Sequence, residues 1–219
     1  MIRRIALILR DPRGASAAEF AILLPLALLF LFGIIDVGRY VWTINQLEKA
    51  AQMGVRYAVA TDIVPQGLNT YDFADACATP LVEGDRICRE ALGAISCSVE
   101  EGQSANSVQC ECAGGNCNSG MIGTESANAF ENIVKRMHFI QNEIVADNVS
   151  VTYAGSGIGY LGDPTRDAAG HPLSDVSPIV TVAISDMEMR SMTFFGAGLR
   201  LPEIKSSLTQ EDGAGYLAY

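Results

Sequence analysis

The first change in hydrophobic pattern comes close to the N-terminus. Residues 20–35 are apolar without interruption, and residues 15–18 extend this run on the other side of Glu19. As a helix, a run from 15 to 35 spans about 31 Å, which matches a hydrocarbon layer of roughly 30 Å. The pattern therefore predicts a membrane-crossing helix over residues 15–36. Pro25 lies inside it and predicts a local loss of helical hydrogen bonding and a kink.

Beyond Asp36 the apolar residues recur at steps of three and four, which is typical of an amphipathic helix. We expect residues 37–61 to continue the first helix without interruption, so that its second half presses an apolar stripe on a folded domain. The alternative is a break near Gly38 that separates two helices. Tyr40 and Trp42 suit a membrane interface in both cases. The stripe consists of Val37, Tyr40, Val41, Ile44, Leu47, Ala51, Val55 and Ala58.

Residues 62–219 have the patterns of a small globular domain. A helix is predicted over 126–146, capped by Ser126, and residues 149–153 alternate as a strand does. The β-branched run at 177–185 predicts a central strand. Further segments are a short helix over 86–95, a strand pair of 95–99 against 107–112, and turns or strands at 187–195, 198–201 and 203–210. This order predicts an α+β fold with an antiparallel sheet. The apolar stripe of the helix is Phe130, Ile133, Val134, Met137, Ile140 and Ile144.

Charge is distributed unevenly along the chain. The net charge is −10, but the first fourteen residues carry four arginines and one aspartate, a local charge of +3 that leaves −13 for the rest. An acidic body argues against nucleic acid as a partner, because phosphate binding needs clusters of Lys and Arg. The basic tip indicates the cytoplasmic flank of a membrane segment, which predicts that residues 62–219 lie on the other side of the membrane.

Six cysteines lie within residues 77–117, a polar and glycine-rich region that we expect to be a loop stapled by disulfides in an oxidising compartment. Reduced thiols in a cytosolic protein are the alternative. The pairing does not follow from the spacing. The cysteines are Cys77, Cys88, Cys97, Cys110, Cys112 and Cys117.

Glu19 stands at the mouth of the apolar run. A carboxylate in hydrocarbon costs about 2–3 kcal/mol, so such a residue usually has a partner or a task. A cleaved secretory signal does not fit, because the run is too long and lacks a cleavage site after it. A plain signal anchor leaves Glu19 unexplained. A prepilin explains it: a basic leader ends in Gly14, and the fifth residue of the helix that follows is glutamate, then Phe20.

The segment "RGASAAEFAILLPLALLFLFGIIDVGRYVWTINQLEKAAQMGVRYA" resembles the N-terminus of the TadE-like family, pseudopilins of the tight adherence (type IVc) pilus system. The later segment "YLGDPTRDAAGHPLSDVSPIVTVAISDMEM" also resembles this family, more loosely. The resemblance implies a pilin-like fold and cleavage by a prepilin peptidase between Gly14 and Ala15. It does not extend to the cysteine region.

In a pilin-like assembly, cleavage would leave a new ammonium at Ala15 among apolar helices. The Glu19 carboxylate of a neighbouring subunit can neutralise it and thereby set the axial register of the two helices. A buried ion pair adds little net stability, but removing one partner costs several kcal/mol. The alternative is that Glu19 merely reaches the membrane interface from the first helical turn.

Motifs for catalysis and for cofactors are missing. The sequence contains no phosphate-binding loop, no dinucleotide fingerprint and no nucleophile elbow. It has two histidines, His138 and His171. The spacing of Cys110, Cys112 and Cys117 is unlike a zinc site, and no EF-hand spacing joins the loop residues Asp163, Asp167 and Asp175. We expect no enzyme activity, cofactor, metal or small-molecule substrate.

The combined prediction is a minor subunit of a tight-adherence pilus. It would cross the inner membrane once, contact lipid before assembly, and then pack with major and minor pilins after processing and extraction by the assembly platform. Its place at the tip, shaft or base is left open. One alternative is an uncleaved inner-membrane anchor whose periplasmic domain organises the secretion complex. Another is a membrane-tethered enzyme or metal-binding domain that uses the cysteine region.

Overall fold

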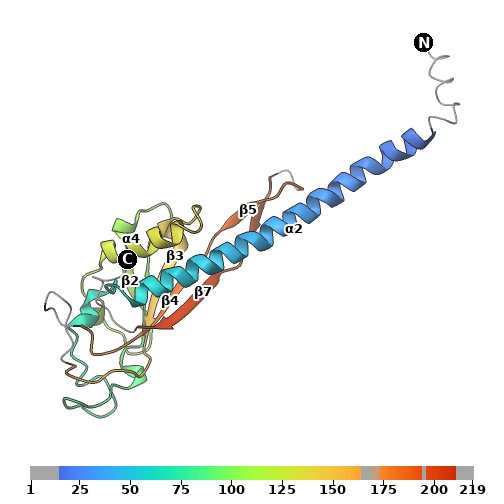
Figure 1. Ribbon diagram of the computed structural model, residues 1–219. Coiled ribbons are helices and arrows are strands. Elements are labelled where there is room, and N and C mark those ends of the chain that lie inside the picture. Colours follow the sequence, from blue (N-terminus) through green and yellow to red (C-terminus); the bar gives the residue numbers. More distant parts are fainter. Residues whose placement is uncertain (1–14, 164–169, 171–172, 194–195, 211–219) are drawn as a thin grey trace. The chain divides into compact units, whose positions relative to one another are not determined.

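One helix dominates the N-terminal part of the chain. The computed structural model describes residues 15–163, 170, 173–193 and 196–210, with the side chains of 15–18 left out. Helix α2 (Ala15–Val59) runs through 45 residues without a break (Figure 1). The prediction of a single helix is therefore confirmed, and the alternative break near Gly38 is not observed. Pro25 lies inside α2, and the helix continues on both sides of it.

The chain divides into two compact units, and the division falls within α2. One unit comprises the chain up to Thr43 together with Glu188–Arg200, and the other comprises Ile44–Met187 and Leu201–Tyr219. The first unit pairs strands β5 (Glu188–Arg190) and β6 (Gly198–Arg200) as an antiparallel hairpin. We call Glu188–Arg200 the hairpin below.

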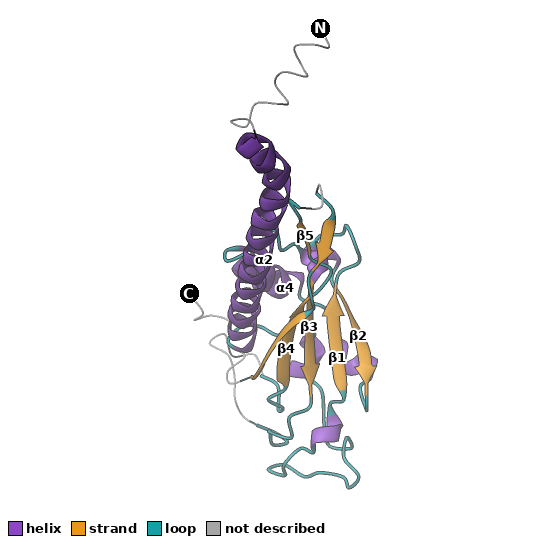
Figure 2. Cartoon of the chain, turned by 90° about the vertical axis from the view of Figure 1, so that its right-hand side faces the viewer, coloured by secondary structure: helices purple, strands orange, loops and turns teal. Residues whose placement is uncertain are grey.

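The second unit contains an antiparallel sheet, as predicted, and the sheet has five strands. Its order is β2-β1-β3-β4-β7, and Figure 2 shows the first four of these strands side by side. The β-branched run of β4 lies between β3 and β7. Side chains alternate, with Val151 and Tyr153 buried on one face and Thr152 and Thr181 partly exposed on the other. One face of the sheet thus covers a core while the other faces water. The strands are β1 (Ala94–Ser98), β2 (Gln109–Gly114), β3 (Val149–Ala154), β4 (Ile179–Ile184) and β7 (Ile204–Thr209).

The buried face of the sheet packs on the end of α2 and on α4 (Ala127–His138). The contact is close at Gly54, where an added Cβ would lie 2.7 Å from the sulfur of Met137 and 3.4 Å from Cγ1 of Val182. Tyr153 is fully buried, and its hydroxyl accepts a hydrogen bond from the Val64 backbone N–H at 3.1 Å. Burial raises the pKa of Tyr153, so the phenol stays neutral in this core.

Helix α4 begins as predicted and ends early. The Ser126 hydroxyl accepts a hydrogen bond from Ala129 N–H at 3.2 Å and caps the helix. The helix ends at His138, whereas the hydrophobic stripe in the sequence predicts an end at 146. Ile144 is nevertheless fully buried, because a turn closed by hydrogen bonds to Met137 and Gln141 returns the chain to the core. Ile144 therefore fits the hydrophobic stripe of α4 although it lies in a turn and not in the helix.

The predicted short helix over 86–95 is wrong. The structure has a 3₁₀ turn, η2 (Arg89–Ala91), followed directly by β1. Gly93 separates the two with a φ of +66° and packs against the backbone of Gly114 and Cys117, an arrangement that excludes any side chain. The remaining short elements are η1 (Gln66–Asn69), η3 (Ala105–Ser107), α3 (Ser119–Ile122) and η4 (Ala146–Asn148).

The six cysteines form three disulfides, each between neighbours in sequence: Cys77–Cys88, Cys97–Cys110 and Cys112–Cys117. The second joins facing residues of β1 and β2, which confirms the predicted strand pair. The region is therefore more ordered than a stapled loop, since Ile95 and Cys97 belong to the sheet core. The sulfur atoms are bonded to one another, so they are not thiolate ligands for a metal.

The close approach at Gly54 predicts the effect of a single methyl group. Gly54→Ala should lower the free energy of unfolding by about 1 kcal/mol, because overpacking against Met137 outweighs the gain in helix propensity. Gly38→Ala is the matched control, because an added Cβ there meets nothing within 4 Å. It should be neutral or slightly stabilising. Urea unfolding of the detergent-solubilised protein, followed by circular dichroism, measures both; equal effects would contradict the packing described here.

Candidate functional site

The apolar part of α2 has almost no protein cover. Every described residue from Glu19 to Ile35 is exposed, apart from Gly33, which is half-buried. By length and composition α2 is able to cross a membrane, and only 6% of its most apolar 18-residue window is buried. A patch of this extent is far larger than soluble monomers usually expose. This surface needs lipid or other helices around it.

The residues predicted to direct processing and register lie at the start of this surface. Ala15 begins α2, while Gly14 lies outside the described residues. Glu19 and Phe20 are exposed, Phe20 to 64%. Glu19 is one helical turn after Ala15, about 6 Å along the axis. Within the described part of the chain the Glu19 carboxylate has no hydrogen-bonded or ionic partner, so any partner must come from outside it.

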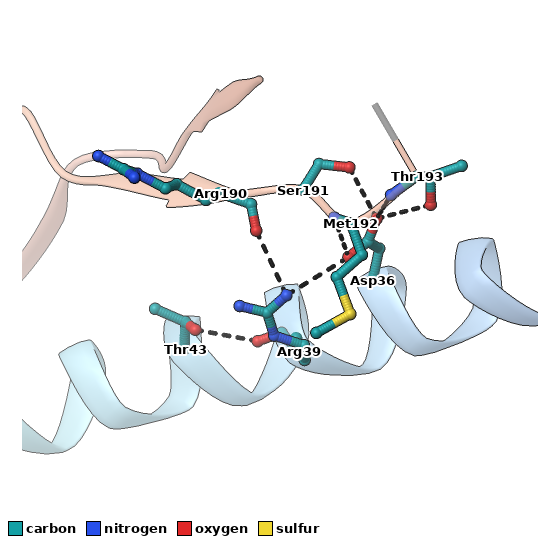
Figure 3. Close-up of polar contacts among 7 residues, drawn as sticks. All are labelled: Asp36, Arg39, Thr43, Arg190, Ser191, Met192 and Thr193. Atoms are coloured by element: carbon teal, nitrogen blue, oxygen red, sulfur yellow. Dashed lines mark hydrogen bonds and ion pairs between the residues drawn. The ribbon is translucent and has the colours of Figure 1, made fainter. Parts of the chain in front are cut away.

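The opposite end of the apolar run carries a polar cluster that the sequence did not predict (Figure 3). The side chain of Asp36 is buried and accepts four hydrogen bonds from the turn of the hairpin. Oδ2 accepts from the Ser191 hydroxyl at 2.7 Å, from the Thr193 hydroxyl at 2.6 Å and from the Thr193 N–H at 2.8 Å, and Oδ1 accepts from the Met192 N–H at 3.0 Å.

Arg39 extends this cluster by one helical turn. Its Nη1 lies 3.6 Å from Oδ1 of Asp36 and donates a hydrogen bond to the backbone carbonyl of Arg190 at 3.3 Å. The guanidinium therefore contacts both the helix and strand β5. Thr43, one turn further, donates its hydroxyl to the Arg39 carbonyl at 3.0 Å. Asp36 and Arg39 together fasten the hairpin to one turn of α2, which we call the Asp36 anchor.

Sequence reasoning predicted both segments of this anchor but not their contact. The sequence predicts a turn or strand at residues 187–195, and it places Asp36 at the end of the apolar run. Asp36 and Ser191 are 155 residues apart. A lone acid beside an apolar run, together with a Ser/Thr-containing turn elsewhere, was the available signal, but nothing in the spacing joins them.

The other candidate residues do not gather into a site. Nδ1 of His138 lies 3.0 Å from the Ile144 carbonyl, a structural contact, and Asp175 accepts a hydrogen bond from Gly162 N–H. Asp167 and His171 lie outside the described residues. Among the described residues no three His, Cys, Asp or Glu side chains are placed to hold a metal ion. A hollow of about 700 Å³ beside the Cys77–Cys88 disulfide contains Asp75 and Glu90 but no histidine.

Removing the anchoring carboxylate should release the hairpin. Asp36→Ala leaves the N–H groups of Met192 and Thr193 without an acceptor, which should favour local opening by about 2–4 kcal/mol. Limited trypsinolysis in detergent should then cut after Arg190 at least tenfold faster than in the wild type. Asp36→Asn keeps one acceptor oxygen, so its rate of cleavage after Arg190 should lie between those of the wild type and Asp36→Ala. Unchanged cleavage of Asp36→Ala would show that the anchor does not hold the hairpin.

Comparisons with known proteins bear on the N-terminal segment. No curated protein and no solved structure matches the chain. A family model does match, over residues 14–56, and its description is TadE-like protein. The matched residues cover nearly all of α2, including Glu19, Asp36 and Arg39. The family is a structural one related to pili and is not known for enzymatic activity. The N-terminal segment is thus TadE-like, as the sequence predicted, and this match supports a protein associated with the Tad pilus.

Proposed function

We propose that the chain is a prepilin-like minor subunit of a tight-adherence pilus, processed after Gly14 and assembled through α2. The observation that carries this proposal is the exposed apolar surface of residues 20–35 directly behind Glu19. Such a helix is stable in lipid and equally stable among similar helices, so transfer from membrane to fibre exchanges one apolar environment for another. Other pilus components are the partners that the family match suggests.

Gly33 offers a place for another helix to pack. A shallow apolar depression of about 460 Å³ is lined by Leu29, Phe30, Gly33, Ile34 and Val37. An added Cβ at Gly33 would meet nothing within 4 Å, so the space above it is open. Small residues at such points let two helix backbones approach closely in an apolar environment. This supports packing between the helices of neighbouring subunits.

Glu19 gives the assembly its register. Its carboxylate has no partner among the described residues, and in an apolar surrounding it requires one. The ammonium that cleavage would create at Ala15 of a neighbouring subunit is a cation that can pair with this carboxylate. The two groups meet when neighbouring helices are shifted along their axes by about one helical turn, because Glu19 is one turn after Ala15. Before assembly the N-terminus lies on the cytoplasmic side and residues 62–219 in the periplasm, in agreement with the basic leader. The prepilin peptidase and the inner-membrane assembly platform act at this stage.

The first rival is an uncleaved membrane anchor that organises the secretion complex. An uncleaved anchor would also have the exposed apolar helix, but it would not need the new N-terminus that cleavage creates at Ala15. The second rival, a metal-binding or catalytic domain built on the cysteines, loses its thiolate ligands to the three disulfides. The choice between cleaved and uncleaved chain is therefore the decisive one.

Processing is tested by the N-terminal residue of protein extracted from native membranes. Mass spectrometry should find Ala15 as the first residue, and Gly14→Val should retain the leader because a bulky side chain blocks the peptidase. Ser16→Ala is the control and should be processed normally. A wild-type chain that keeps its arginine-bearing leader in a working pilus system would refute the proposal and favour the uncleaved anchor.

The register role of Glu19 is tested in assembled fibres. Glu19→Ala removes one partner of a buried ion pair, at a cost of about 3–5 kcal/mol, so incorporation into sheared fibres should fall at least tenfold. Glu48→Ala, an exposed glutamate further along the same helix, is the matched control and should leave incorporation unchanged. Both variants should keep their disulfides and the wild-type circular dichroism spectrum. Normal incorporation of Glu19→Ala would show that another feature sets the register.

A further inference from the structure

The Asp36 anchor fixes the hairpin at a definite height on α2. Asp36 is the first charged residue after the apolar run, and 21 helical residues before it span about 31 Å, close to the thickness of a hydrocarbon layer. When α2 crosses a membrane, Asp36 therefore lies at the edge of the hydrocarbon on the side away from the N-terminus. The turn residues Ser191, Met192 and Thr193 are bound to its carboxylate, so the turn of the hairpin lies at the same edge.

The side chains exposed at this height suit a lipid interface. Met192 is held by its backbone N–H while its side chain is 57% exposed. On α2, Val37 directly follows Asp36 and is exposed to 64%, and Trp42, six residues after Asp36, is exposed to 67%. Tryptophan is enriched where headgroups meet acyl chains, and an exposed thioether is apolar enough to enter the same boundary. Exposed apolar side chains are therefore present both on α2 just beyond the apolar run and on the turn that is bound to Asp36.

The hairpin carries two arginines, Arg190 and Arg200, and one glutamate, Glu188. In the unit that comprises the chain up to Thr43 and the hairpin, the described residues include three arginines (Arg39, Arg190 and Arg200) and three acids (Glu19, Asp36 and Glu188). Arg39 is engaged in the anchor, and Nε of Arg200 lies 3.7 Å from Glu188. The exposed Arg190 guanidinium has no partner in the described part of the chain and points away from Asp36 (Figure 3). A guanidinium binds phosphate through paired N–H groups.

We propose that the hairpin is a second membrane contact, which rests on the leaflet opposite the N-terminus. Met192 enters the boundary between headgroups and acyl chains, and Arg190 binds the phosphate of an anionic phospholipid. This contact goes beyond the proposed function, because it requires only that α2 crosses the membrane and requires neither cleavage nor fibre assembly. It fixes the depth of the helix, and it explains why the acid at the hydrocarbon edge is covered by donors from the hairpin.

The contact is tested with a fluorescent reporter on the turn. Met192→Cys, labelled with the environment-sensitive fluorophore NBD, preserves the backbone bond from residue 192 to Asp36. The described native cysteines are all in disulfides, which leaves the new thiol for labelling. The full chain is reconstituted alone into vesicles of phosphatidylcholine and phosphatidylglycerol. We expect quenching by lipids that carry a spin label near the headgroup, and at least threefold protection from aqueous iodide relative to the same protein in urea. A reporter open to iodide and unaffected by the labelled lipids would overturn the proposal.

Two controls separate the possible failures. Trp42 is the single tryptophan of the chain, so its own quenching by the labelled lipids shows that α2 is inserted. With Trp42 quenched and the NBD reporter in water, the hairpin contact is refuted while the helix remains in the membrane. Protection that appears only after purified pilus fibres are added would also overturn the proposal, because the surface would then belong to another subunit. N-terminal processing, the test of the proposed function, is independent of all these results.

The phosphate contact has a matched pair of variants. Arg190→Gln should reduce the iodide protection of the reporter, and should abolish the difference between vesicles with and without phosphatidylglycerol. Lys205→Gln removes the same charge from β7 in the other unit, where the lysine pairs with Glu203 at 3.0 Å, and should change neither. Equal behaviour of the two variants would refute lipid phosphate as the partner of Arg190.

Discussion

The need to keep residues 20–35 of α2 away from water governs the rest of the molecule. Each fully buried large aliphatic or aromatic side chain contributes about 1.5–3 kcal/mol, so a run of this length makes lipid or neighbouring helices obligatory. The folded domain does not provide that environment, because these residues are exposed in the described part of the chain. A charged group beside this run lies next to an apolar environment and therefore needs a hydrogen-bonding or ionic partner. The run has such a group at each end, the carboxylates of Glu19 and Asp36.

Glu19 and Asp36 meet the same requirement in different ways. Asp36 is satisfied within the chain by four donors of the hairpin and by Arg39. Glu19 has no such partner among the described residues, so it is available for a group on another molecule. An acid that is satisfied internally stabilises one subunit, whereas an acid left open specifies how subunits meet. The first role is visible in the structure, and the second is the proposal that links this helix to fibre assembly.

The second unit uses different means to reach stability. Its sheet covers a core on one face, and the end of α2 packs there at Gly54, where the absence of a side chain permits contact with Met137 and Val182. Three short-range disulfides constrain residues 77–117, as is common in domains that fold in an oxidising compartment. The chain therefore combines a helix adapted to apolar surroundings with a domain adapted to water.

The sequence by itself determined the features that depend on local periodicity: the continuous helix, the strands at 149–154 and 179–184, the cap at Ser126 and the TadE-like N-terminus. It did not determine the end of α4, because a turn brings Ile144 into the core where a continued helix would also have placed it. It also did not determine the structure of residues 86–95, where a 3₁₀ turn and Gly93 with a positive φ are found in place of the expected helix. Disulfide pairing and the Asp36 anchor were decided by the tertiary structure alone. The spacing of six nearby cysteines allows several pairings, and the local path of the chain, such as the facing strands β1 and β2, selects one of them. The anchor joins residues 155 positions apart, and no pattern of neighbouring residues encodes such a contact.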